Sequence, residues 1–436
     1  MNENVGKKLI SNSFWMMASK IYSMLVSLIV GSLSARYLGP SNYGLLNYGT
    51  AIISFFTTVS SLGLSFTIVV EMVKKPEKAG RYVGTALVMR LVTALISFVG
   101  IFVIVAILEP DNKLLQNVTC LQAIAVILNS YEVLLYWFQM QLKMKFVTMA
   151  SMVALTLTGI WRISLLMLNA SVEFFALSNS VTALVSGGIV AVIFFKQDHP
   201  KLSFDRKDGM FLLKGSYHFI ISGLAVTLYS QLDRIMLGKM LSTDMVGFYS
   251  AAMVIATMWE FVPHALINSA RPVITELKQK DECEYMKKYK LLLMSINALG
   301  LAVSVGFLLV GGMAVHILYG ASYAPSALPL KILIWSTSFA MIGTARVVWL
   351  VNEGIGGYEK YFTIMGSVVN IVLNTLFIPI WGIVGAAVTT LLSQMFVAIV
   401  APLFCKKTKA FVVIYFESFK EIPELVGIAK KYLLKR

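Results

Sequence analysis

The sequence predicts an all-α integral membrane protein with about twelve transmembrane helices in two six-helix lobes. Of its 436 residues, 58% are apolar and 14% are charged, whereas a soluble domain carries about 25% charged residues. The mean hydropathy is +0.77, and apolar stretches longer than about 18 residues, each able to cross a bilayer as a helix, recur along the chain. Only helices or closed barrels satisfy their backbone polar groups in hydrocarbon, and long continuous apolar runs favour helices.

The predicted spans divide evenly between two lobes, residues 1–200 and 201–405, which a tail at 406–436 follows. The spans of the first lobe are Asn12–Ala35, Leu45–Val70, Val83–Leu108, Gln116–Gln139, Val147–Leu168 and Phe174–Phe195. Those of the second lobe are Gly215–Gly238, Val246–Arg271, Leu291–Leu318, Ala327–Val351, Tyr361–Ile380 and Val384–Phe404. The longest polar connection between spans, Lys196–Lys214, lies between the lobes.

Basic residues predict the orientation of the chain. One set of alternate connections, together with both termini, contains 27 Lys and Arg, whereas the other set contains only Arg36, Lys113 and Lys239. Basic loops stay on the cytoplasmic side, so we expect a multi-pass protein of the cell (inner or plasma) membrane with both termini cytoplasmic. The tail mixes aromatic residues with eight basic ones, which is typical either of an interfacial amphipathic helix on anionic lipid or of a solvated segment.

Several functional classes are disfavoured by composition. The net charge of +15 arises largely in the connections between spans, where it sets topology, so nucleic acid is not an expected partner. Three widely spaced Cys and four His form no metal or disulfide pattern, and we expect no cofactor, no metal and no catalytic residue. A membrane polysaccharide polymerase or ligase would be expected to have a large outer loop, and the predicted outer loops are short. We therefore expect a protein that is not an enzyme.

A weak internal repeat supports the division into two lobes. The connection Leu38–Leu45 between the first two spans aligns with Leu241–Phe248 between spans seven and eight after a shift of 203 residues, which also places Arg36 on Lys239. With six spans in each lobe, the two lobes share one orientation, as in transporters whose halves are related by an axis along the membrane normal.

Ionisable residues in and beside the apolar segments are the candidate site residues, because charges in hydrocarbon are costly and mark functional sites. The candidate substrate-binding residues are Lys20, Arg36, Arg90, Arg162, Arg234, Arg271, Lys331 and Arg346. The candidate ion-coupling residues are Glu132, Asp233, Glu260 and His264. Basic residues outnumber acidic ones within the spans, and phosphate or pyrophosphate suits Arg forks and Lys point charges. This excess favours an anionic ligand over a cationic drug.

Two interpretations of the deeper charges remain open. Arg90 and Glu132 lie at similar depths on neighbouring spans and could form a buried ion pair that joins two helices. Alternatively, Lys20 and Arg90 line a cationic cavity, an interpretation that Arg162 favours because its own span carries no evident acid. Residues near span ends could instead extend to the membrane surface: Arg234, Arg271, Lys331 and Arg346. Pro263 is expected to kink its span.

Three segments resemble polysaccharide flippases of the Wzx type: L-I-S-N-S-F-W with A-R-Y-L-G-P-S-N-Y-G at 35–44, D-R-I-M-L-G at 233–238 with V-G-F-Y, and N-I-V-L-N-T-L-F-I-P-I-W-G-I-V-G-A-A-V-T-T at 370–390. The resemblance implies the MATE-like fold of the multidrug/oligosaccharidyl-lipid/polysaccharide (MOP) exporters, with a central cavity between two lobes. One departure is Glu71, where a basic residue is expected.

The resemblance further implies alternating-access export of polyprenyl-pyrophosphate-linked oligosaccharide repeat units, as in O-antigen or capsule assembly, from the cytoplasmic to the outer leaflet. The implied partners are that lipid-linked oligosaccharide, membrane lipids, and a polysaccharide polymerase with its chain-length machinery. A MATE-like drug or ion antiporter is the alternative, and a membrane polymerase or ligase is less favoured.

Overall fold

The computed structural model describes residues 3–196 and 200–433, and within these ranges the regular structure is helical, with no strand. Ten of the described helices are long and apolar enough to cross a membrane. Two of them, Met17–Ser60 and Gly356–Phe404, contain 44 and 49 residues, and 44 helical residues measure about 66 Å, twice the thickness of a bilayer core. Non-helical backbone at Gly39 and Gly382 divides each of these into two spans. The prediction of an all-α protein with about twelve spans is therefore confirmed.

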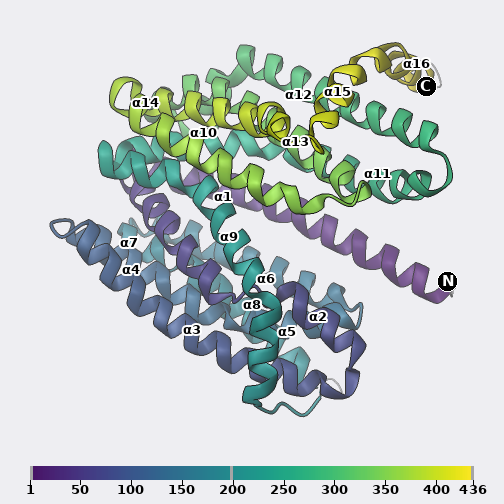
Figure 1. The fold of residues 1–436 in the computed structure, drawn as a ribbon. Helices are drawn as coiled ribbons and strands as arrows, with labels where there is room; N and C mark the ends of the chain where they lie inside the picture. Colours follow the sequence, from purple (N-terminus) through teal and green to yellow (C-terminus); the bar gives the residue numbers. More distant parts are fainter. Residues whose placement is uncertain (1–2, 197–199, 434–436) are drawn as a thin grey trace. The chain divides into compact units, whose positions relative to one another are not determined.

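The chain forms two compact units, Met1–Ile235 and Met236–Arg436 (Figure 1). The sequence predicts a division near residue 200, whereas the structure has it within helix α9, Arg206–Met240. The reason is the first part of α9, where Leu212 is fully buried in the core of the amino-terminal unit with Tyr82 and Phe138. This helix therefore belongs mostly to the unit that precedes it.

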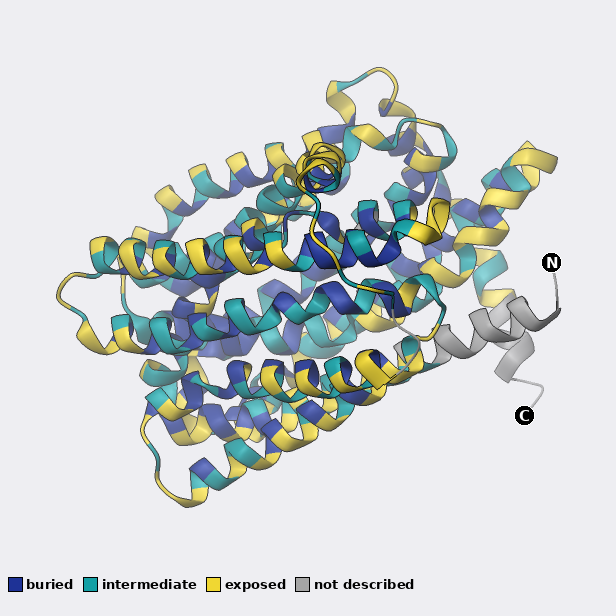
Figure 2. Ribbon diagram, turned by 90° about the horizontal axis from the view of Figure 1, so that it is seen from below, coloured by how far each residue is buried: buried dark blue, intermediate teal, exposed yellow. Residues whose placement is uncertain are grey.

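The amino-terminal unit consists of α1–α8 and most of α9. Its other helices are α1 (Glu3–Ser60), α2 (Leu64–Lys74), α3 (Ala79–Leu108), α4 (Lys113–Leu128), α5 (Glu132–Met140), α6 (Met144–Met167), α7 (Val172–Ala176) and α8 (Ser178–Lys196). Figure 2 shows many helices with exposed residues on one side and buried residues on the other. On α3 the exposed side carries Ile96, Val99 and Phe102, and large exposed apolar surfaces are typical of membrane contact.

The predicted connection between the first two spans is a single kink in α1. Gly39 has φ 69° and ψ 172°, a conformation that residues with a Cβ rarely adopt, and Pro40 suits the first position of the helix that follows. In the predicted repeat, Gly39 aligns with Ser242, which has extended backbone, and helix α10 begins at Thr243, the residue aligned with Pro40. The two halves therefore interrupt their helices at matching positions.

The second predicted span, Leu45–Val70, is wrong as a continuous helix. Helix α1 ends at Ser60 and α2 begins at Leu64, because Leu62 and Gly63 have φ values of 54° and 61°. A Cβ added to Gly63 would lie 2.8 Å from the backbone oxygen of Ser216 on α9. Only glycine therefore allows both this turn and the close approach of α9.

Two other predicted spans contain short 3₁₀ turns. The predicted span Gln116–Gln139 is interrupted at Asn129–Tyr131, so that Glu132 is the first residue of α5. The predicted span Val246–Arg271 is interrupted at Met258–Glu260, directly before the helix that contains Pro263. The break lies just before the proline because its ring would clash with the carbonyl of the preceding turn.

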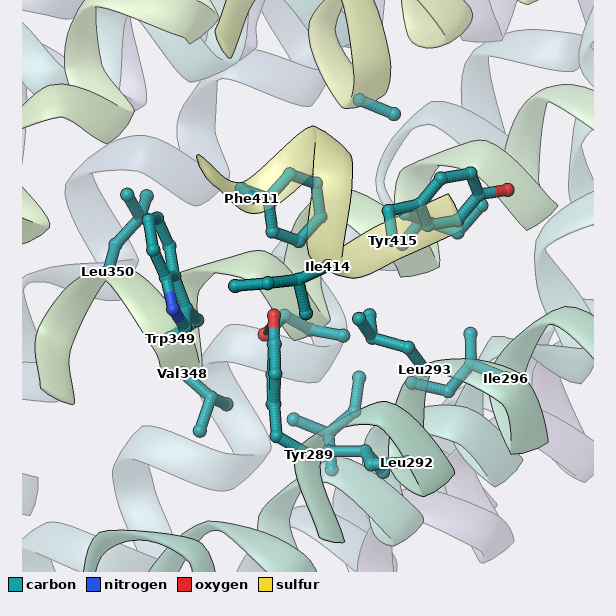
Figure 3. Close-up of a cluster of buried hydrophobic side chains, with 14 of the residues drawn as sticks. Tyr289, Leu292, Leu293, Ile296, Val348, Trp349, Leu350, Phe411, Ile414 and Tyr415 are labelled. Carbon is teal, nitrogen blue, oxygen red and sulfur yellow. Dashed lines mark hydrogen bonds between the residues drawn. The ribbon is translucent and has the colours of Figure 1, made fainter. Parts of the chain in front are cut away.

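The carboxy-terminal unit contains α10 (Thr243–Thr257), α11 (Phe261–Lys280), α12 (Glu282–Tyr319), α13 (Ala327–Asn352), α14 (Glu359–Met395), α15 (Lys409–Glu417) and α16 (Ile422–Leu433). Its core joins α12 and α13 to the tail (Figure 3), where Phe411 and Ile414 of α15 pack with Leu293 and Trp349. Of the two alternatives left open for the tail, a fully solvated segment does not fit its first helix, because one face of α15 is part of the core. The side chains beyond residue 427 lie outside the described part.

Candidate functional site

Three adjoining cavities lie within the amino-terminal unit. The first, here called the arginine cavity, has a volume of about 370 Å³ and is lined by α1, the Asn129–Tyr131 turn, α6 and α8, with Arg162 and Glu132 in its wall. The second, called the neutral cavity, has a volume of about 420 Å³. A third of about 200 Å³ is lined by Arg162 and also by Gln122 of the neutral cavity. Asn179 lines all three, so the cavities are contiguous.

Local breaks in the helices place polar groups in the arginine cavity. The 3₁₀ turn Asn129–Tyr131 puts Asn129 and Tyr131 in its wall, and Glu132 follows at the start of α5. Irregular backbone at membrane depth is tolerated where it is buried in protein or lines a wet cavity. In the same cavity wall, Thr158 of α6 hydrogen-bonds Thr182 of α8 at 2.8 Å. The wall thus combines hydroxyl, amide and charged groups.

Arg162 is the candidate cation that enters these cavities. It lies on α6, is half-buried, and among the described residues forms no ion pair with a carboxylate. The other charged residue in the wall, Glu132, accepts a hydrogen bond from Nη2 of the buried Arg90. The charges of Arg90 and Glu132 offset one another, so Arg162 leaves this group of three residues with one excess positive charge.

Arg90 and Glu132 thus form the ion pair that the sequence left as one of two interpretations. The Arg90 side chain is 4% exposed and that of Glu132 is 40% exposed, so the carboxylate is the partner that faces the cavity. This pair joins α3 to the start of α5. Its geometry supports a structural role for Arg90.

Arg346 also has structural partners, in the carboxy-terminal unit. Its side chain is fully buried, and Nη2 donates to both carboxylate oxygens of Glu359 at 3.1 and 2.9 Å. Nη1 donates to the carbonyl oxygens of Val397 and Ala398, which lie in a π-helical segment, Phe396–Val400. Because a π-helical turn disturbs the regular ladder of backbone hydrogen bonds, Arg346 supplies donors that the widened helix lacks.

The remaining candidates do not line the three cavities. Lys20, Arg36 and Arg271 are exposed, and Lys331 is half-buried. Arg234 donates to Gln231 at 2.5 Å. Among the ion-coupling candidates, Asp233 is buried, whereas Glu260 and His264 are half-buried on either side of the start of α11. These residues are distributed over both units.

Uncharged residues of the cavities were not among the sequence candidates. The neutral cavity is lined by Thr50, Ser54, Thr58, Gln122, Thr227 and Gln231, among others, and none of its described lining residues is charged. Gln122 donates to the Leu46 carbonyl at 3.1 Å and to Thr50 at 3.2 Å. The sequence does contain a feature that could have identified these residues: amide side chains such as Gln122 occur within long apolar runs. Polar groups in hydrocarbon need partners and therefore mark candidate sites.

Comparison with known proteins identifies relatives. Residues 9–278 match the family model described as "Polysaccharide biosynthesis protein". "Probable flippase AglR" of Haloferax volcanii is 30% identical over 179 residues, which span 40% of this chain but only 37% of the relative. "Putative O-antigen transporter" of Escherichia coli K12 is 21% identical over 397 residues, covering 89% of this chain and 94% of that protein.

Solved structures have the same fold. "Lipid II flippase MurJ, inward closed conformation" matches with a TM-score of 0.66 at 14% identity, over 94% of this chain and 91% of that one. A eukaryotic MATE transporter, AtDTX14, matches with a TM-score of 0.63 at 14% identity, over 95% of this chain and 98% of that one. The predicted MATE-like fold is thereby confirmed, and the predicted resemblance to polysaccharide flippases is confirmed by the family match and the relatives named above. The match over residues 9–278 covers more than half of the sequence, and the chain belongs to the family of polysaccharide biosynthesis proteins.

Proposed function

We propose that this chain is a flippase that transfers polyprenyl-pyrophosphate-linked oligosaccharides from the cytoplasmic to the outer leaflet of the cell membrane. Arg162 receives the anionic part of the substrate, and the contiguous neutral cavity receives sugar. The transfer is transport rather than chemical catalysis, and proceeds by alternating access. Both termini are cytoplasmic, and a polysaccharide polymerase with its chain-length machinery receives the product.

The observation that carries the proposal is the unpaired guanidinium of Arg162 in a polar cavity. A buried charge is retained where it has a counter-charge or a ligand, and among the described residues no carboxylate pairs with this one. A planar guanidinium binds phosphate oxygens through two parallel N–H groups. Ser27, Asn179 and Thr182 line the same cavity and offer further hydrogen bonds to phosphate oxygens.

The neutral cavity supports the carbohydrate part of the proposal. Its hydroxyl and amide side chains both donate and accept hydrogen bonds, as sugar hydroxyls do. Its volume of about 420 Å³ lies within the range of small-molecule sites. Since Asn179 lines both this cavity and the arginine cavity, one ligand can extend from the phosphate end to the sugar end.

A cation antiporter of the MATE type fits the amino-terminal cavities less well. The carboxylate in the arginine cavity, Glu132, is already paired with Arg90. The adjacent guanidinium of Arg162 adds a positive charge that repels a cationic drug. The cavity therefore favours an anion.

A binding assay with Arg162→Gln tests the proposal without knowledge of the glycan. We expect farnesyl pyrophosphate to bind the purified wild-type protein, and Arg162→Gln to weaken binding about tenfold or more, since one charge-assisted pair contributes about 1.5–3 kcal/mol. Arg162→Lys retains the charge and should lose less. Arg206→Gln, at the exposed start of α9, is the matched control, and farnesol reports binding that needs no phosphate. Equal affinities of wild type and Arg162→Gln for farnesyl pyrophosphate would refute the assignment.

A further inference from the structure

The segment after the last span is fixed to the carboxy-terminal unit by one face. The last apolar segment ends at Phe404, and α15 begins five residues later. Phe411, Ile414 and Tyr415 point into the core (Figure 3). The Tyr415 hydroxyl donates to Oδ1 of Asn297 on α12 at 3.1 Å. The start of the tail is thus held at the end of a membrane span.

The opposite face of this segment is apolar and exposed. Its large apolar side chains recur every three or four residues, and each is between 41% and 58% exposed: Val413, Phe416, Phe419, Ile422 and Val426. Such spacing places them on one side of a helical segment. A continuous apolar stripe is unfavourable in water and typical of contact with a membrane or another protein.

The charges of the segment are divided between its two faces. Glu417 pairs with Lys290 of α12 at 2.6 Å, and Glu424 pairs with Lys287 of α12 at 2.8 Å. Hydrogen bonding to the Lys290 ammonium lowers the pKa of Glu417, so this carboxylate stays ionised and paired. Four lysines of the segment are exposed and form no ion pair with a described residue: Lys406, Lys407, Lys409 and Lys420. Two of the three acids of the segment, Glu417 and Glu424, are thus engaged by α12, and the four lysines still outnumber the remaining acid, Glu421.

A small crevice lies beside the exposed stripe. It has a volume of about 200 Å³, and α12, α13 and the tail line it with Leu301, Trp335, Phe339 and Phe419. Phe419 belongs both to this crevice and to the exposed stripe. An apolar chain that enters the crevice would therefore lie beside a surface that carries unpaired lysines.

We propose that residues 406–426 form a binding site for anionic phospholipid of the bilayer. The apolar stripe lies in the boundary between headgroups and acyl chains, the four lysines contact lipid phosphate, and part of one acyl chain occupies the crevice. Charge complementarity and continuity with the span that ends at Phe404 identify lipid, rather than a protein, as the occupant. This site is separate from the arginine cavity and does not depend on the transported substrate.

Spin labels in the full-length protein test the position of the stripe. In a variant with Cys120, Cys283 and Cys405 replaced by Ser, a nitroxide at Phe416→Cys in phosphatidylglycerol-containing vesicles should collide with oxygen and be shielded from a water-soluble nickel chelate. A label at Glu276→Cys, on the exposed end of α11, should be accessible to the nickel chelate and should collide less with oxygen. Free access of the nickel chelate to position 416 would overturn the proposal.

Lipid retention tests the chemistry of the site. Native mass spectrometry of protein equilibrated with equal amounts of phosphatidylglycerol and phosphatidylcholine should show preferential retention of phosphatidylglycerol. Replacing the four lysines with Gln should reduce this preference at least fivefold, since each lysine near an anionic surface contributes about that factor. Ala298→Leu, which fills the crevice, should lower the amount of retained lipid while the label at 416 stays shielded. An unchanged lipid preference in the lysine variant would refute the anionic site.

Discussion

Glu359→Gln is expected to destabilise the carboxy-terminal unit, because it leaves the guanidinium of Arg346 buried without a counter-charge. Arg346 is fully buried, whereas the Glu359 side chain is 31% exposed. Removing one partner of a buried ion pair costs about 3–5 kcal/mol. We expect about 3 kcal/mol, the lower end of that range, because Glu359 is partly solvated and the carbonyls of Val397 and Ala398 still accept from Arg346.

For a unit of about 200 residues, 3 kcal/mol corresponds to a fall in Tm of about 6–12 °C. The assay is the fraction of detergent-purified protein that stays monodisperse after heating. Glu276→Gln is the matched control: its pair with Lys280 has side chains that are 64% and 68% exposed, and exposed pairs contribute at most about 1 kcal/mol. If Glu359→Gln lowers Tm no more than this control, the assignment of a structural charge pair is wrong.

Three further predictions concern the amino-terminal unit. Glu132→Gln should lower Tm by less than Glu359→Gln does, by about 3–6 °C for about 1.5 kcal/mol, because Glu132 is 40% exposed; an unchanged Tm would contradict the pairing with Arg90. Gly63→Ala should destabilise the unit by about 1–3 kcal/mol, since it combines positive φ with contact to the Ser216 carbonyl, whereas Gly188→Ala, in open space, should be nearly neutral in the same assay. Backbone N–H groups at the start of α9 lower the pKa of Asp205 in the folded protein. The Asp205 carboxylate therefore stabilises the fold at pH values above its unfolded pKa of about 3.9. This stabilisation is lost as the pH falls through the lower pKa of the folded state. Melting curves between pH 7 and pH 3 should therefore show a smaller loss for Asp205→Asn than for wild type, and equal losses would refute this.

Helix breaks could be predicted where the sequence marks them with proline, and were missed where it does not. The Gly39–Pro40 kink follows from two residues with strong backbone preferences, and the break before Pro263 from one. The turn at Leu62–Gly63 lies within the apolar run S-L-G-L, where an isolated glycine is compatible with a continuous helix. Its positive φ is selected by the approach of α9 from far along the chain, which no local pattern records.

The same contrast holds for the charged residues: some of their contacts could be predicted from positions along the chain, and others depend on how distant helices pack. The similar depths of Arg90 and Glu132 on neighbouring spans allowed an ion pair as one of two interpretations, and the structure contains that pair. Arg346 was placed among the substrate ligands because its partner, Glu359, lies in a predicted cytoplasmic connection rather than in a span. Pairing with Glu359 and with the carbonyls of a π-helical turn depends on how α13 and α14 pack. The number of charged residues could be counted from the sequence, but the partner of each charged side chain could not be predicted from it.

The position of a helix break and of an ion pair explains how Arg162 can lack a carboxylate partner among the described residues. An unpaired guanidinium in dry protein would be costly, yet Arg162 lies in a cavity whose wall includes the Asn129–Tyr131 turn. The same turn places Glu132 where Arg90 neutralises it. One interruption of a membrane helix therefore supplies polar groups to the cavity wall and places Glu132 where its ion-pair partner is Arg90. The paired arginine joins α3 to the start of α5, and the unpaired one is the residue that we propose to bind an anion.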